Sequence, residues 1–233
     1  MIDVYTWPTP NGHKVHIMLE EVGLKYAVHP INIRSGEQFS EDFLRISPNN
    51  KIPAIVDSDG PDGKPISVFE SGAILVYLAG KTGKLLPRDV RGKYAALEWV
   101  MFQMASVGPM MGQAGHFRGN AAPEPKEYPI MRYTNEVKRL HGVMERRLTE
   151  NRYFAGKDYS VADIAIWPWL RASERNGIVW SEFPVLKRWF DTIAARPAVQ
   201  RGVQVLADKV APAGTYDDKA REILFGKTQY EKR

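Results

Sequence analysis

The chain has 233 residues, a net charge of +5 and no cysteine. Its length allows one large or two small domains, and the lack of cysteine excludes disulfides, thiolate-bound zinc and a thiol nucleophile belonging to the protein. Basic residues occur at most in pairs among acidic ones, which favours a solvated mixed-charge surface and no nucleic-acid partner.

The first 83 residues predict the order β-α-β-α-β-β-α, which is typical of an α/β domain. Apolar residues recur at helical spacing after the first strand, and alternating residues follow in the second strand. Aspartate-glycine pairs mark the turn of a later hairpin. The predicted elements are strands over residues 2–7 and 26–33, a helix over 11–22, a helix beginning at Ser40, a hairpin over 52–69 and a buried helix over 71–81.

Beyond a linker that begins at Leu85, the strand signal disappears and helical periodicity takes its place. We therefore predict an all-helical bundle domain over residues 89–206, after the N-terminal domain of residues 1–83. The last segment, residues 207–233, is polar without a clear period, and we expect a tail that packs loosely on the surface. The helical segments predicted for the domain of residues 89–206 cover residues 89–118, 125–150, 160–176 and 183–206.

The first predicted strand meets the first helix at a corner that contains Thr9, Pro10 and Asn11. Thr9 suits the N-cap position, and Pro10 suits the first helical position because its missing N–H costs nothing there. The structural interpretation is simply a well-formed helix start. In the functional interpretation, a thiol held at this helix N-terminus ionises more easily, and Thr9 and Asn11 donate hydrogen bonds to its sulfur.

Ile52 and Pro53 stand directly before a predicted strand. A trans proline is common at the start of a strand, whereas only about 5–6% of bonds before proline are cis in folded proteins. A cis bond would turn the Ile52 backbone outward and leave its N–H and C=O free to pair with an extended peptide. Both interpretations stay open on the sequence alone.

Glu70 and Ser71 end a predicted strand and begin the buried helix. An acidic residue at a helix N-terminus is a common structural feature, because it faces the positive end of the helix dipole. The functional interpretation is recognition of an amino-acid head group. Glu70 would pair with an α-ammonium group, and the N–H and hydroxyl of Ser71 would bind an α-carboxylate.

Taken together, these three corners resemble the glutathione transferase superfamily, and the resemblance covers about residues 1–206. The segment "SVADIAIWPWL" carries Ser160 and Asp163 in a capping-box pattern that is similar to the superfamily's helical domain. The segments "PTPNGHKV", "VFESGAILVYL" and "GPMMGQAGHF" resemble the bacterial Nu class, which is related to Ure2-like fungal proteins. This resemblance implies a thioredoxin-like N-terminal domain, a helical second domain and a homodimer.

The same resemblance implies glutathione, or glutathione disulfide, as the bound cofactor. Thr9 and Asn11 would lie near its sulfur, Gln38 and Lys51 near its glycine carboxylate, and the Ile52 backbone beside its cysteinyl backbone. Arg132 would reach the site from the partner subunit, although an ordinary solvated arginine on a helix is an equally open interpretation. The residues implied for ligand binding are Asn11, Gln38, Lys51, Ile52, Pro53, Glu70, Ser71 and Arg132.

The implied activity is glutathione-dependent disulfide-bond reduction, because a protein without cysteine can only activate a thiol that arrives on a ligand. Small-molecule thiols and disulfides would be its substrates. The alternatives are conjugation of glutathione to electrophiles, peroxide reduction, or a regulatory protein that binds glutathione without turnover.

The five histidines show no metal-ligand spacing, so we expect surface or supporting roles for them and no metal site. The tryptophans of "WPWL" are expected in the core. Residues 1–5 lack the basic and apolar regions of a secretory signal, and no apolar run has membrane-spanning length. We therefore expect a cytoplasmic protein without membrane contact.

Overall fold

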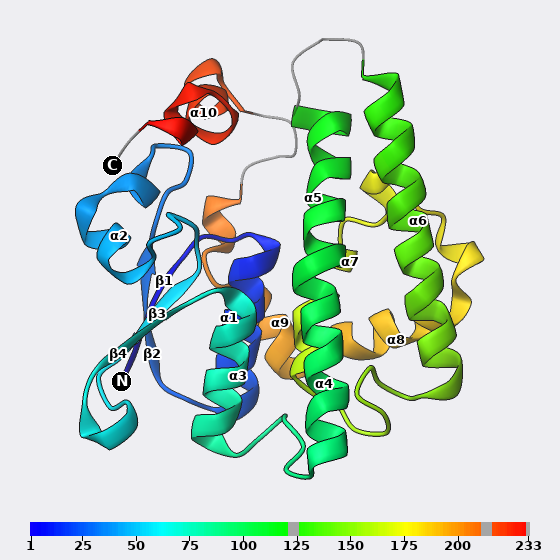
Figure 1. Cartoon of the computed structure of the whole chain (residues 1–233), viewed down its shortest axis with the longest axis horizontal. Coiled ribbons are helices and arrows are strands. Elements are labelled where there is room, and N and C mark those ends of the chain that lie inside the picture. The colour runs from blue at the N-terminus through cyan, green and yellow to red at the C-terminus, as the bar shows by residue number, and fades with distance from the viewer. Residues whose placement is uncertain (121–125, 211–215, 232–233) are drawn as a thin grey trace.

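The N-terminal part of the chain forms a four-stranded mixed sheet (Figure 1). The computed structural model describes residues 1–120, 126–210 and 216–231. The sheet order is β2-β1-β3-β4, in which β1 runs parallel to β2 and antiparallel to β3, and β3 runs antiparallel to β4. Its strands are β1 (Ile2–Thr6), β2 (Tyr26–Pro30), β3 (Ala54–Asp57) and β4 (Ile66–Phe69).

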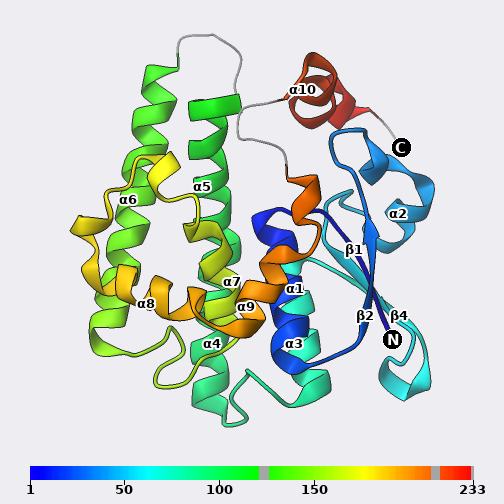
Figure 2. The same cartoon turned by 180° about the vertical axis from the view of Figure 1, so that it is seen from behind.

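Three helices cover this sheet: α1 (Pro10–Val22), α2 (Glu41–Ile46) and α3 (Ser71–Thr82). Figures 1 and 2 show α1 and α3 between the sheet and the other helices, with α2 on the opposite side of the sheet. Gly12 lets α1 start close to β1, because a Cβ at this position would lie 2.1 Å from the carbonyl oxygen of Trp7.

The second strand is shorter than the sequence pattern predicts. It ends at Pro30 instead of continuing to residue 33. The chain turns immediately afterwards, where the Asn32 side-chain oxygen accepts a hydrogen bond from the Arg34 N–H at 3.0 Å. This local turn competes with the extended conformation that the alternating pattern favours.

The second part of the chain is helical, as predicted. Helices α4 and α5 form one long rod, interrupted by a π-helical segment over Gln103–Val107 and followed by another over His116–Asn120. Helix α6 runs beside α5 in the opposite direction (Figure 1). The helices are α4 (Val90–Phe102), α5 (Gly108–Gly115), α6 (Glu127–Glu150), α7 (Val161–Leu170), α8 (Pro184–Ala194) and α9 (Pro197–Gln204).

Helix α7 lies at the centre of the helical part, and it begins with the predicted capping box of Ser160 and Asp163. Asp163 also accepts hydrogen bonds from the Phe154 N–H and from the indole N–H of Trp189 at 2.9 Å. Burial raises the pKa of this carboxyl to about 6, against the opposing effect of these donors. The capping box therefore ties three segments of the helical part together.

The two parts of the chain pack closely where α1 meets α7 and α9. A Cβ at Gly202 would lie 2.8 Å from the backbone of Ile17, so only glycine permits this approach. Glu21 accepts two hydrogen bonds from Arg196, the shorter at 2.6 Å, beside this contact. The sheet and the helical bundle are therefore held in a fixed relation, which the site between them requires.

The C-terminal segment differs from the loose tail predicted from its polarity. It contains helix α10 (Asp218–Phe225), which Asp217 caps and which lies near α2 (Figure 1). Ala220 and Ile223 are buried, and Ile223 packs against Gly36. Two buried positions in one short charged helix are too weak a pattern to stand out in the sequence.

Short 3₁₀ helices connect the main elements. Within the described residues, no helix is both long and apolar enough to cross a membrane. The 3₁₀ segments are Glu37–Phe39, Pro61–Gly63, Glu174–Asn176, Trp180–Glu182, Ala207–Lys209 and Lys227–Tyr230.

Candidate active site

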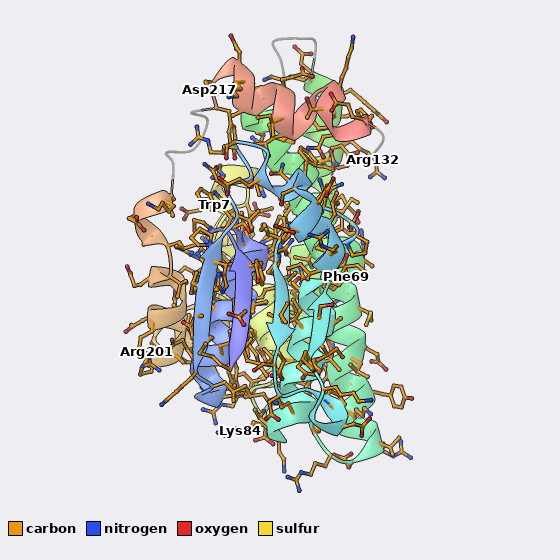
Figure 3. All side chains as sticks on the ribbon, turned by 90° about the vertical axis from the view of Figure 1, so that its left-hand side faces the viewer. Trp7, Phe69, Lys84, Arg132, Arg201 and Asp217 are labelled. Carbon is orange, nitrogen blue, oxygen red and sulfur yellow. The ribbon has the colours of Figure 1, made fainter. Side chains whose placement is uncertain are left out.

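A cavity of about 380 Å³ lies between the sheet domain and the helical domain. One wall comes from α1, from the segment before β3, from Phe69 at the end of β4 and from the N-terminus of α3. Figure 3 labels Trp7, which directly follows β1, and Phe69, which ends β4. Both lie at the same end of the sheet, because β1 and β4 each run antiparallel to β3. The other wall comes from the π-helical segment, from α5 and from α7.

The N-terminus of α1 has the cap that the sequence predicts. Thr9 accepts a hydrogen bond from the Gly12 N–H at 3.2 Å, and Pro10 occupies the first helical position. Asn11 lines the cavity, whereas Thr9 lies beside it and is not part of its lining. The Thr9 hydroxyl keeps its own hydrogen, because an accepted hydrogen bond uses only an oxygen lone pair.

The peptide bond between Ile52 and Pro53 is cis, which the sequence left open. Both residues line the cavity, and β3 begins only at Ala54, so Ile52 lies outside the strand ladder. Lys51 lines the same edge, where its Nζ donates to the side-chain oxygen of Gln229 at 3.0 Å. Partial burial lowers the pKa of Lys51.

Glu70 and Ser71 line the cavity at the N-terminus of α3. Glu70 has a φ of 68°, in the left-handed region that residues other than glycine seldom adopt. Such a conformation persists only where the surrounding structure enforces it, and it is concentrated at functional sites. The exposed Glu70 carboxylate and the unpaired N–H groups of the first helical turn thus lie side by side.

Lys14 is a site residue that sequence reasoning missed. It lines the cavity although its side chain is completely buried. Its Nζ donates to Ser71 Oγ at 3.1 Å and to Gln103 Oε1 at 2.5 Å. Burial lowers the pKa of this amine to about 7, and the negative charge of Glu70 opposes that shift.

Trp169 is also part of the site, although the tryptophans of "WPWL" are predicted to be core. Trp167 fits that prediction, because it is buried and donates to the Phe190 carbonyl at 2.9 Å. Trp169 instead lines the cavity and donates to Asn11 Oδ1 at 2.9 Å. The sequence spacing of the two tryptophans does not reveal this difference.

Besides Thr9, two further predicted site residues lie away from the cavity lining. Gln38 is buried and its amide donates to the Ile33 carbonyl at 3.2 Å, while its side-chain oxygen has no hydrogen-bond partner among the described residues. Arg132 is exposed on α6 and is labelled in Figure 3. Six predicted residues do line the cavity together: Asn11, Lys51, Ile52, Pro53, Glu70 and Ser71.

The histidines are less exposed than the sequence suggests. His13, His16 and His141 are buried, and burial is the largest cause that lowers their pKa values, to about 3, 4 and 4 respectively. For His13, the charge of Arg171 lowers the pKa further. These rings are neutral at physiological pH and do not line the cavity, so they are poor candidates for a catalytic base.

Two family models match the chain: "Glutathione S-transferase, N-terminal domain" over residues 1–80 and "Glutathione S-transferase, C-terminal domain" over residues 104–197. The chain belongs to the glutathione transferase family. This confirms the predicted superfamily and the predicted order of a thioredoxin-like domain and a helical domain.

Among relatives of this glutathione transferase is the disulfide-bond oxidoreductase YfcG of Escherichia coli (strain K12). It is 49% identical over 85% of this chain and 92% of its own. A glutathione transferase from Burkholderia graminis, solved with two glutathione molecules per subunit, has 48% identity and a TM-score of 0.84 over 88% of each chain. One from Pseudomonas putida, solved with one glutathione disulfide per subunit, has 45% identity and a TM-score of 0.83 over 88% of this chain and 91% of its own.

Proposed function

We propose that this glutathione transferase reduces disulfide bonds with the thiol of bound glutathione. The single observation that carries the proposal is the convergence of Asn11, Ile52 and Glu70 on one cavity in a chain without cysteine. The similarity to YfcG, a named disulfide-bond oxidoreductase, supports the same activity. Because the chain has no cysteine, the reacting sulfur must come from the ligand.

The cavity has a complementary group for each part of the tripeptide. Glu70 would pair with the α-ammonium of the γ-glutamyl residue, and the N–H and hydroxyl of Ser71 would bind its α-carboxylate. The backbone of Ile52, held out of the ladder before Pro53, would pair with the cysteinyl backbone. Lys51 would bind the glycine carboxylate, once its bond to Gln229 is exchanged.

The ligand sulfur would then lie at the N-terminus of α1. The Asn11 amide and the Thr9 hydroxyl would donate to it, and the helix dipole would favour its thiolate form. The thiolate attacks one sulfur of the substrate disulfide, which forms a mixed disulfide with glutathione and releases the first substrate thiolate. A second glutathione thiolate attacks the glutathione sulfur of that mixed disulfide, which yields glutathione disulfide and the second thiolate.

Glutathione binding by Gln38 and Arg132 also stays a proposal, but neither residue lines the cavity within a single chain. Gln38 would have to exchange its bond to Ile33 to reach the glycine end. Arg132 would act from a partner subunit in a homodimer. Support for that homodimer comes from large apolar side chains that α4 and α6 leave exposed. Their exposed fractions are 61% for Tyr94, 57% for Met101, 70% for Tyr128 and 54% for Met131.

A paired assay of the purified protein tests the function. Glutathione is supplied with a small dithiol-derived disulfide in one cuvette and with an aryl halide in the other. We expect faster turnover of the disulfide. Turnover of the aryl halide alone would identify a conjugating enzyme instead, and glutathione binding without turnover of either would identify a regulatory protein.

A cytoplasmic location remains part of the proposal, because the chemistry needs a reducing pool of glutathione.

A further inference from the structure

The buried side chain of Lys14 ends among three hydrogen-bond acceptors from other segments. Its Nζ lies 3.1 Å from Ser71 Oγ, 2.5 Å from Gln103 Oε1 and 3.5 Å from Met104 Sδ. An ammonium group has three N–H donors and no acceptor. The three partners can therefore accept hydrogen bonds from the charged form of Lys14, although burial opposes that form.

This cation lacks a counter-ion in the part of the chain that the structure describes. No aspartate or glutamate there forms an ion pair with Lys14, and Glu70 acts on it only at longer range. Burying an unpaired charge is unfavourable, which is why burial lowers the pKa of Lys14 to about 7. A ligand anion next to Nζ would remove that penalty.

Ser71 connects Lys14 to the cavity. Its hydroxyl oxygen accepts from Lys14, and its own hydrogen, which donates weakly to Met104 Sδ at 3.6 Å, can turn to a stronger acceptor on a ligand. Its backbone N–H is one of the unpaired donors at the start of α3. The charge of Lys14, the Ser71 hydroxyl and this helix terminus thus meet at one point of the cavity lining, where a carboxylate fits all three.

We propose that Lys14 is the counter-ion of the ligand's γ-glutamyl α-carboxylate, and that glutathione binding drives the uptake of one proton onto its Nζ. This inference rests on the proposed function and deepens it. In this step a proton from the buffer forms a new N–H bond at Nζ, while the ligand carboxylate stays ionised. The affinity for glutathione is then linked to pH through a residue that makes no contact with the thiol.

Other titratable groups near Lys14 come from four segments. Glu70 precedes α3, and Lys51 lies on the segment before β3 at the far edge of the cavity. His13 and His16 neighbour it on α1, and Arg171, just after α7, contacts His13 at 3.2 Å. Neither histidine titrates near neutral pH, because their pKa values lie at about 3 and 4. Lys51 is the group that could imitate the effect, so it provides the control.

The test is calorimetric titration with S-methylglutathione, whose blocked thiol contributes no proton. Titrations at about pH 7.5 in buffers of different ionisation enthalpy give the number of protons bound with the ligand. We expect uptake of about half a proton or more per bound ligand in the unmodified protein. Lys51→Met, which should bind the ligand more weakly because it removes the partner of the glycine carboxylate, should keep this uptake per bound ligand. Lys14→Met should abolish the uptake and weaken binding about tenfold or more. Lys14→Arg, whose guanidinium stays charged, should bind without uptake.

The result that overturns the inference is binding without proton uptake by the unmodified protein, or equal uptake in Lys14→Met. If Lys14→Met does not fold, equal uptake in Lys14→Arg and the unmodified protein has the same force. A protein that binds neither S-methylglutathione nor glutathione would overturn the proposed function as well. The failure of the inference alone is therefore distinct from the failure of the function.

Discussion

The indole N–H of Trp169 donates to Asn11 Oδ1 at 2.9 Å, across 158 positions of sequence. Because an indole N–H can only donate, the Asn11 atom that faces it must be the oxygen. The amide NH₂ group of Asn11 is then the part left for the cavity, which both residues line. In the proposed mechanism, Trp169 is therefore a positioning residue for the Asn11 amide that would donate to the glutathione sulfur.

Trp169→Phe should lower kcat for disulfide reduction about 2- to 12-fold, which corresponds to one neutral hydrogen bond of about 0.5–1.5 kcal/mol. The KM for glutathione should change little, because Asn11 is proposed to contact only the sulfur. Trp167→Phe is the matched control, since its indole donates to the Phe190 carbonyl instead. Equal losses of kcat in the two variants would show that only packing matters.

Asn11→Ala should weaken turnover by a similar factor and leave the binding of S-methylglutathione nearly intact. The physical reason is that the lost donor stabilises the thiolate and not the peptide backbone of the ligand. Steady-state kinetics and calorimetry measure the two quantities separately. Loss of binding together with turnover would contradict the proposed place of Asn11 beside the sulfur.

Glu70→Gln should raise the dissociation constant of glutathione about tenfold or more, because it removes a charged partner of the α-ammonium group. Glutamine keeps the size of the side chain at the left-handed backbone position of residue 70. Asp158→Ala, which removes another exposed carboxylate, is the control. Calorimetry that finds unchanged affinity in Glu70→Gln would refute the assigned head-group site.

Arg132→Ala should weaken glutathione binding if two chains associate, because Arg132 lies on the exposed face of α6 and does not line the cavity of its own chain. Arg139→Ala on the same helix is a fitting control, since Arg139 pairs with Glu136 of its own chain. Sedimentation measures the oligomeric state of all three proteins. A monomer would remove this role for Arg132.

The stability of the protein should fall as the pH falls from about 6.5 to about 4. His13, His16 and His141 have folded-state pKa values below the unfolded value of 6.5, so the unfolded chain binds more protons in this window. Asp163, whose pKa is raised to about 6, acts in the opposite direction. The net effect is a loss of about 2–3 kcal/mol of unfolding free energy per pH unit near about pH 5.5.

Urea unfolding at several pH values measures this slope. His16→Gln should make this slope smaller by the equivalent of about one bound proton, because the substitution removes one of the three neutral buried rings. An unfolding free energy that is flat across the window would mean that the histidines titrate normally in the folded protein.

Local sequence signals predicted much of the fold. Thr9, Ser40 and Ser160 each cap a helix that starts at the next residue, because capping depends on neighbours within one turn. The corners at Ile52 and Glu70 could likewise be predicted, because each is defined by residues that are neighbours in the sequence. The burial of Lys14 could not be found in this way, because it depends on Gln103, which lies 89 positions away. The role of Trp169 likewise depends on a distant partner.

In the proposed mechanism, the protein lowers the pKa of a glutathione thiol that it holds at the N-terminus of α1. The most direct measurement is the ultraviolet absorbance of the thiolate of bound glutathione, followed as a function of pH. We predict a midpoint at least about one pH unit below the ordinary thiol value of about 8.5. A bound thiol that titrates with the same midpoint as free glutathione would contradict the account.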